Sequence, residues 1–172
     1  MTTRLVIMAD THLPKRAKAL PTELWQAMET ADVVIHAGDW VELELVDELQ
    51  ARSARLLACY GNNDGPDIAA RLPLVAEAVI EQLSFAVVHE TGAKQGREAQ
   101  MDRQFGGEFP RDVLVFGHSH IPWDTTTSAG MRLLNPGSPT DRRRQPHCTY
   151  MTATVEGATL DVELHSLPAA KT

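Results

Sequence analysis

The chain has 172 residues, of which 43% are hydrophobic, and a formal net charge of −7. This length suffices for one domain without disulfides. Cys59 and Cys148 lie far apart in the sequence, and no apolar signal segment precedes the first predicted strand. We therefore expect a reduced, cytoplasmic setting. The acidic balance argues against broad capture of a nucleic acid polymer, and the lack of an apolar run of about 18 residues argues against a membrane span.

The first half of the chain alternates between strand-like and helix-like patterns. Amphipathic segments at 22–30 and 41–51 separate three apolar runs, which read LVIMA, VVIHAG and RLLACYG. Pro21 and Thr22 are start signals for the first helix, with Thr22 a candidate N-cap. This order predicts βαβ units and a parallel sheet.

The second half is richer in strand patterns. The runs LVAEAVIE and LSFAVVHE predict two antiparallel strands, 93–105 predicts a polar helix, and DVLVFGHSH predicts a further buried strand. Two hairpins should follow, turning near Ala129-Gly130 and Glu156-Gly157. The sequence therefore predicts an α/β fold with two packed sheets flanked by helices, in a single domain over residues 1–172.

Polar side chains follow five of these apolar runs. Because buried strands of an α/β sheet deliver ligand-binding residues at their carboxyl ends, we expect the five tips to meet in one site. In extended chain, residues two positions apart point to the same side, so one strand end can supply two donors. The pooled donors are Asp10, His12, Asp39, Asn62, His89, His118 and His120.

Seven oxygen and nitrogen donors of this kind suit two divalent transition-metal ions. The carboxylate of Asp39 has two oxygens and can bridge two cations, and the mixture with imidazoles favours Mn²⁺, Fe, Co²⁺, Ni²⁺ or Zn²⁺ over Ca²⁺ or Mg²⁺. Such a pair polarises a phosphoryl group and activates a hydroxide for in-line attack, which predicts phosphoester hydrolysis. The chain lacks the Gly-x-Ser-x-Gly elbow of carbon-ester hydrolases.

The ordered motifs resemble the calcineurin-like metallophosphoesterases. They are Asp-x-His (10–12), Gly-Asp (38–39), Gly-Asn (61–62), a lone His89 and Gly-His-x-His (117–120). The short chain and the segment Asn-Pro-Gly-Ser at 135–138 resemble the small bacterial and archaeal phosphodiesterase group.

The resemblance implies a four-layer αββα sandwich and a binuclear metal-dependent phosphodiesterase, with Mn²⁺ as the first choice of metal. It also implies a small phosphoester substrate and makes a homo-oligomer plausible. By the same resemblance Asp39 bridges the two metals, and each metal has three further ligands. These are Asp10, His12 and His120 for one metal, and Asn62, His89 and His118 for the other.

Two residues depart from the family pattern. Many members carry a histidine after Gly-Asn that protonates the leaving group, whereas this chain has Asn63, which cannot deliver a proton. We therefore expect phosphodiesterase activity that is weak or depends on the leaving group. Glu90 replaces the usual glycine after the metal-binding histidine, where it would crowd or repel a phosphate or pair with a nearby arginine.

Several other residues have two alternative roles each. Asp64 would orient Asn63 or act on a bound water, which makes Asp39, Asn63 and Asp64 the catalytic candidates, or it serves the turn beside Gly65. His36 is a partner of a metal ligand or a structural histidine. The basic run Arg142–Arg144 contacts the substrate phosphate or is solvated, and Trp40 stacks on a nucleobase or packs.

The sequence is also compatible with two alternative functions. One is phosphomonoesterase action on a small phosphorylated metabolite or nucleotide, because pocket walls rather than metal ligands separate the two substrate classes. The other is a non-catalytic interaction scaffold, as the retromer subunit with this fold resembles a repurposed enzyme. The seven retained donors favour an enzyme over a scaffold.

Overall fold

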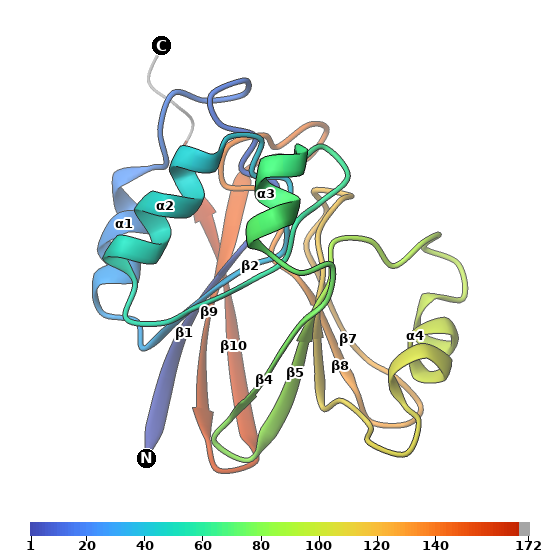
Figure 1. Ribbon diagram of the computed structural model, residues 1–172. Coiled ribbons are helices and arrows are strands. Elements are labelled where there is room, and N and C mark those ends of the chain that lie inside the picture. Colours follow the sequence, from blue (N-terminus) through green and yellow to red (C-terminus); the bar gives the residue numbers. More distant parts are fainter. Residues whose placement is uncertain (169–172) are drawn as a thin grey trace.

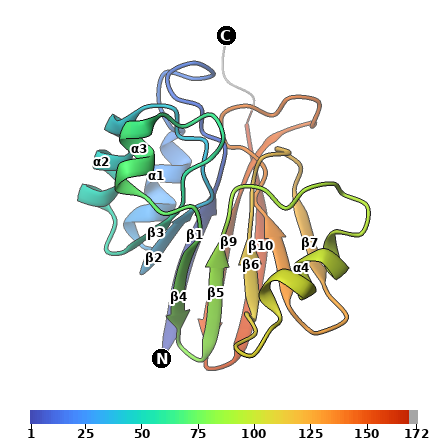
Figure 2. The ribbon, with the colours of Figure 1, turned by 45° about the vertical axis from the view of Figure 1, so that its right-hand side comes forward.

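The computed structural model describes residues 1–168 and contains two five-stranded sheets packed between helices (Figures 1 and 2). Helices α1, α2 and α3 cover the first sheet, and α4 lies against the second, as the α/β sandwich prediction requires. In chain order the elements are β1 (Thr2–Met8), α1 (Thr22–Glu29), β2 (Val33–His36), α2 (Leu43–Arg52), β3 (Leu56–Ala58), α3 (Pro66–Arg71), β4 (Ala76–Ile80), β5 (Leu83–Val87), α4 (Arg97–Phe105), β6 (Val113–Val115), β7 (Trp123–Thr126), β8 (Arg132–Asn135), β9 (Cys148–Glu156) and β10 (Thr159–Leu167).

The first sheet has the order β10-β9-β1-β2-β3. Strands β1, β2 and β3 are parallel, with Leu5 opposite Val33 and Val34 opposite Leu56, as the alternating pattern predicts. The C-terminal hairpin joins this sheet through β9, which runs antiparallel to β1, and turns at Gly157 with φ +58°. A left-handed turn residue of this kind favours glycine.

The second sheet has the order β4-β5-β6-β8-β7. Strands β5, β6 and β8 are parallel, while β4 and β7 run antiparallel to their neighbours. The predicted antiparallel pair β4–β5 and the predicted hairpin β7–β8 are therefore confirmed. The sheet is mixed, and two of the loops with predicted metal donors follow its parallel strands β5 and β6.

The alternation of side chains along β1 shows how the layers are held together. Leu5 and Ile7 pack into the core between the two sheets, whereas Val6 and Met8 face the helices α1–α3. A third cluster, which includes Met101, joins the second sheet to α4. Because every β1 residue from Leu5 to Met8 is at least 98% buried, the strand reads as a continuous apolar run.

Three local expectations needed correction. The N-cap of α1 is Pro21, and Thr22 makes no capping hydrogen bond because it is already the first helical residue. The polar helix predicted over 93–105 begins only at Arg97, after Gly96 with φ +72°. The short helix α3, which begins at Pro66, was not among the predicted elements.

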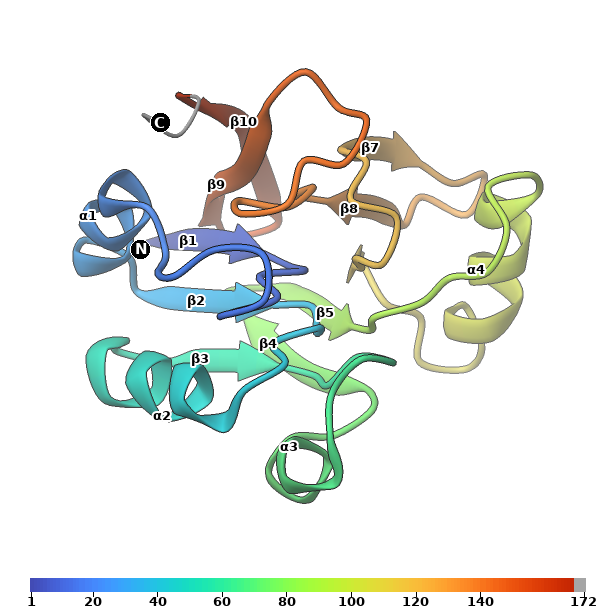
Figure 3. The same cartoon turned by 90° about the horizontal axis from the view of Figure 1, so that it is seen from above.

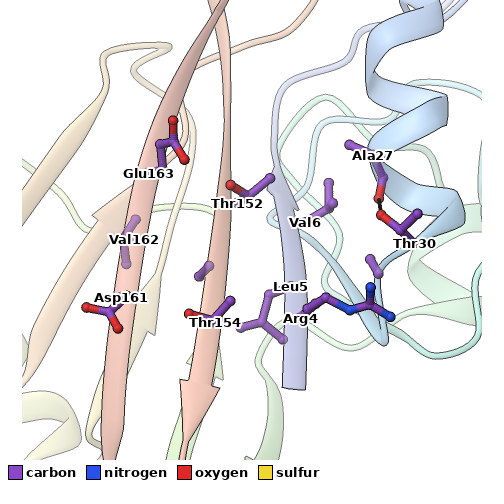
Figure 4. A pocket seen from close by; sticks show the side chains of 12 residues that line it. Arg4, Leu5, Val6, Ala27, Thr30, Thr152, Thr154, Asp161, Val162 and Glu163 are labelled. Atoms are coloured by element: carbon purple, nitrogen blue, oxygen red, sulfur yellow. Dashed lines mark hydrogen bonds between the residues drawn. The ribbon is translucent and has the colours of Figure 1, made fainter. Parts of the chain in front are cut away.

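A groove of about 460 Å³ lies on the outer surface of the first sheet, where α1 borders β1, β9 and β10 (Figure 4). Arg4, Thr152 and Glu163 are among its lining residues, and none of the seven predicted metal donors takes part. The groove is therefore separate from the predicted metal donors. None of the helices within residues 1–168 is long and apolar enough to cross a membrane.

Candidate metal centre

Five loops meet where parallel strands of both sheets end. Figure 3 shows β1, β2 and β3 pointing to one edge of their sheet, beside the end of β5. The loops after β1, β2 and β3 carry Asp10, His12, Asp39 and Asn62. The loops after β5 and β6 carry the remaining histidines, His89, His118 and His120. The predicted pooling of polar strand ends is thus what the fold provides.

The backbone at these loops differs from the extended chain that we expected. Strand β1 ends at Met8, and Asp10 and His12 have φ of +56° and +45°. His118 and His120 have φ of +71° and +60°. Such left-handed conformations are strained for residues other than glycine and are typical of functional sites. The two donors of each pair are therefore brought together by a tight loop, and the argument from strand geometry was wrong.

Asp39 lies between two of the histidines. Its Oδ2 atom is 3.4 Å from Nε2 of His12 and 3.3 Å from Nε2 of His89. Asp10 Oδ1 is 3.5 Å from Nε2 of His120. In each of these pairs, a carboxylate oxygen and a ring nitrogen face each other across a small space.

The other two donors lie at the edge of this space. His118 Nδ1 is 3.1 Å from Oδ1 of Asn62 and 3.3 Å from Nε2 of His89. Both residues are solvent-exposed, whereas Asp10, His12, Asp39, His89 and His120 are at least 93% buried. The structure therefore gathers all seven predicted donors, five inside and two at the opening.

Hydrogen bonds fix which ring nitrogen of two histidines faces the space. His89 donates from Nδ1 to the carbonyl of Ala37 at 2.7 Å, and His120 donates from Nδ1 to the carbonyl of Asp141 at 2.6 Å. A neutral imidazole then carries its lone pair on Nε2, the atom that faces the carboxylates. This arrangement prepares both rings to coordinate a metal.

The donors fit metal ions by a second test. The Nε2 atoms of His12 and His120 are buried and have no hydrogen-bond partner among the described residues. A buried polar atom without a partner destabilises a protein unless something else binds it. Two groups of donor atoms lie close enough to hold an ion, Asp10 with His12 and His120, and Asp10 with Asp39 and His89. Together with the chemistry of the donors, this supports binding of divalent metal ions.

The electrostatics keep Asp39 ionised. Burial raises its pKa, but hydrogen bonding and charge from the protonated form of His89 and hydrogen bonds from Asn63 outweigh burial and hold the pKa well below its usual range. A carboxylate that stays ionised at neutral pH is available to a cation.

Asp64 organises the two loops that carry Asp39 and Asn62. Its carboxylate accepts hydrogen bonds from the backbone N–H groups of Asp39 at 3.0 Å, Val41 at 2.8 Å and Gly61 at 2.7 Å. Burial raises its pKa. The described residues give no hydrogen bond from Asp64 to the Asn63 side chain, so the geometry favours the loop-stabilising interpretation.

Replacing Asp64 by alanine should destabilise the protein. Three backbone donors would lose a charged acceptor, which we expect to lower the free energy of unfolding by roughly 2–3 kcal/mol. For a chain of this size that corresponds to a fall in Tm of about 5–10 °C, measurable by calorimetry. Asp47→Ala is the matched control, because Asp47 is exposed and its side chain bonds only Arg71 within residues 1–168. Equal melting temperatures for the two variants would refute this role.

Glycine is required where two site loops touch. A β-carbon on Gly61 would overlap Oδ1 of Asp39. A β-carbon on Gly117 would lie 2.9 Å from Oδ2 of Asp10, closer than real contacts allow. The Gly-Asn and Gly-His motifs thus let the loops approach the two carboxylates.

Asn63 holds Asp39 rather than reaching outward. Its backbone N–H donates to Oδ1 at 2.9 Å, and its side-chain amide donates to Oδ2 at 2.7 Å. The amide therefore orients the predicted bridging carboxylate, a role that the sequence alone did not indicate.

His36 and Trp40 support the loops from within. His36 accepts a hydrogen bond at Nδ1 from the N–H of Gly38, so its other nitrogen donates to Thr11, 3.1 Å away. Burial lowers the pKa of His36 well below its usual value. Trp40 is fully buried, stacks on His36 with ring centroids 3.6 Å apart, and donates to the carbonyl of Cys59. The packing interpretation of Trp40 is therefore correct.

The segment after β8 ties the site together from far along the chain. Ser138 donates to the carbonyl of Asp10 at 2.7 Å, and Thr140 donates to the carbonyl of Thr11 at 2.6 Å. The buried Asn135 donates to the carbonyl of Gly117 at 3.0 Å. Sequence reasoning noted the Asn-Pro-Gly-Ser segment but not this role, which needed the three-dimensional contacts.

Two charged residues flank the opening. Glu90 lies 3.7 Å from Nδ1 of His118 and has no arginine partner among the described residues, contrary to one of our expectations. Of the basic run, Arg143 donates a long hydrogen bond of 3.4 Å to the carbonyl of His118. Arg142 instead bonds the carbonyl of Gln145.

Comparison with known proteins agrees with this geometry. The model of the calcineurin-like phosphoesterase superfamily domain matches residues 3–158. A probable metallophosphoesterase from Methanothermobacter thermautotrophicus is 30% identical over 92% of this chain and 89% of its own length. A phosphodiesterase from Methanocaldococcus jannaschii is 29% identical over 68% of this chain and 73% of its own length. The structure of vacuolar protein sorting 29 from Cryptosporidium parvum superposes with a TM-score of 0.83 at 20% identity, covering 99% of this chain and 94% of that one, and so shares the fold.

Proposed function

Because this chain belongs to the calcineurin-like phosphoesterase superfamily, we propose that it is a phosphodiesterase with a binuclear metal centre. The observation that carries the proposal is the position of Asp39, whose Oδ2 atom lies within 3.4 Å of a histidine on either side. One carboxylate between two donor groups is what a bridging ligand requires.

The six remaining donors form two groups of three, one for each proposed metal ion. Asp10, His12 and His120 would hold one ion, and Asn62, His89 and His118 the other, with Mn²⁺ as the first candidate. When bound, such ions supply Lewis acidity toward the phosphoryl group and a nucleophile near neutral pH. Because Asn62 and His118 are exposed, a substrate would reach the centre from their side.

The chain's own residues orient the metal centre, but the residue at position 63 cannot protonate the leaving group. Asn63 holds Asp39 through two hydrogen bonds, and His89 and His120 are fixed by backbone carbonyls. Many relatives have a histidine at this position that donates a proton to the leaving group, whereas this chain has Asn63. We therefore propose that the enzyme cleaves esters of acidic alcohols well and esters of alkyl alcohols poorly.

The test is a rate panel with metal analysis of the same sample. Protein loaded with Mn²⁺, Zn²⁺, Co²⁺ or Ni²⁺ is assayed with bis-p-nitrophenyl phosphate and with p-nitrophenyl phosphate. We expect about two metal ions per chain and faster cleavage of the diester. Faster cleavage of the monoester would make the protein a phosphomonoesterase, and no cleavage of either ester with any metal would favour an interaction scaffold.

Arg143 supports substrate binding in this proposal. Its guanidinium lies beside the His118 backbone, and a charge-assisted hydrogen bond to phosphate contributes about 1.5 kcal/mol. We expect Arg143→Ala to raise KM for bis-p-nitrophenyl phosphate about tenfold, with kcat nearly unchanged. Arg144→Ala, which removes an exposed charge of the same run, is the control. Steady-state kinetics in which both variants match the parent would contradict the assignment.

A further inference from the structure

A cavity of about 330 Å³ opens directly beside the proposed metal centre. Two of the proposed metal ligands, Asn62 and His89, form part of its wall, so a phosphoester held at the metals would direct one ester substituent into it. This volume is at the lower end of what small-molecule sites have. The lining residues are Tyr60, Gly61, Asn62, Leu74, Val75, Val88, His89, Glu90 and Gln104.

One side of the cavity is apolar although it faces solvent. Leu74 and Val75 are 60% and 36% exposed, and they belong to the loop between α3 and β4. Exposed aliphatic side chains at the mouth of a cavity can cover the carbon skeleton of a ligand and shield it from water. The substituent that fits here has an apolar body.

Among the described residues that line the cavity, Glu90 alone carries a carboxylate. Its side chain is 53% exposed, and its only ionic neighbour among the described residues is His118, 3.7 Å away. None of the described lining residues is a lysine or an arginine. A carboxylate that no lysine or arginine of the lining neutralises attracts positive charge and repels negative charge, so the cavity disfavours a substituent that ends in a phosphate.

We propose that this cavity is a substituent-binding subsite in which Glu90 selects phosphodiesters that carry an ammonium group. The inference rests on the proposed phosphodiesterase function, which it deepens by naming a substrate class. The aliphatic wall covers the carbon atoms of the substituent, and the Glu90 carboxylate pairs with its positive charge. Glu90 is thereby a specificity-determining residue.

Two substrates that differ only in charge test the inference. One is p-nitrophenyl phosphorylcholine, and the other is p-nitrophenyl 3,3-dimethylbutyl phosphate, in which carbon replaces the quaternary nitrogen. In each, the oxygen of water bonds to phosphorus, the bond from phosphorus to the p-nitrophenyl oxygen breaks, and p-nitrophenolate leaves while one proton of the water passes to solvent. We expect the metal-loaded parent to favour the cationic ester about fivefold in kcat/KM, the effect of one partly exposed ion pair.

Glu90→Gln should bring this ratio to about one, and Glu90→Lys should reverse it. Glu108→Gln, which removes an exposed carboxylate outside the cavity, should leave the ratio unchanged. Metal content is measured in each variant, because a Glu90→Gln protein that loses a metal would identify Glu90 as a ligand and overturn the inference.

The outcomes separate the inference from the proposed function. If the parent cleaves both esters at equal efficiency, or Glu90→Gln keeps the preference, the subsite assignment is wrong while the phosphodiesterase stands. If neither ester is cleaved, the proposed function fails. Titration calorimetry of both esters then decides the subsite independently, since equal dissociation constants would overturn it and a Glu90-dependent preference would support it.

Discussion

Asp39→Asn is expected to lower kcat/KM for bis-p-nitrophenyl phosphate by about 10³-fold. The substitution keeps the shape of the side chain but removes the charge that would bridge two cations, and bridging metals contribute several kcal/mol to the transition state of phosphoryl transfer. Asp39 Oδ2 is also the atom shared by His12 and His89, so its replacement affects both donor groups at once. Steady-state kinetics at saturating Mn²⁺ measures the effect.

Metal binding provides the control for this prediction. At an Mn²⁺ concentration about 100 times its Kd, the parent should gain roughly 3 kcal/mol of stability, whereas Asp39→Asn should gain much less. Asp47→Asn, on the exposed face of α2, should behave as the parent. An Asp39→Asn protein that keeps its rate and its metal would exclude Asp39 as the bridging ligand.

Asn63→His is expected to increase the rate on an alkyl diester by about 10²-fold. The parent has no residue at this position that can protonate an alkoxide, and a positioned general acid commonly contributes 10²–10⁴-fold. The backbone N–H at residue 63, which donates to Asp39, is kept in the variant. A p-nitrophenyl ester should gain little, because its leaving group needs no proton.

The pH dependence distinguishes a new general acid from an altered pocket. The gain on the alkyl ester requires protonated imidazole, so it should decline as the pH rises above the pKa of the introduced histidine, about 6.5 if unperturbed. Asn63→Ala removes the same amide without supplying a proton. Similar rates for the histidine and alanine variants on the alkyl ester would argue against the missing-acid explanation.

The sequence was informative wherever local pattern and burial coincide. The buried apolar strand β1 and the amphipathic stretch of α2 could be predicted, and so could the hairpin that turns at Gly157, because each depends on side chains close together in the chain. The donor set was predictable for a related reason. Carboxylates and imidazoles after successive buried strands must meet if those strands are parallel neighbours.

What the sequence did not reveal depends on contacts between distant segments. Left-handed backbone at Asp10 or His118 has no signal in a residue other than glycine, since the strain is imposed by the surrounding loops. The interaction of Asn63 with Asp39 required the loop after β3 to fold over the loop after β2. Helix α3 has only six residues, too few for a helical period to stand out from a turn.

The contact of Ser138 with the Asp10 carbonyl has a consequence for the order of assembly. The two residues are 128 positions apart, and His120 depends in turn on the carbonyl of Asp141. During synthesis on the ribosome, the first ligands would therefore emerge long before the residues that lock them in place. A nascent chain shorter than about 141 residues should lack a complete metal site, so metal capture would follow translation of nearly the whole fold.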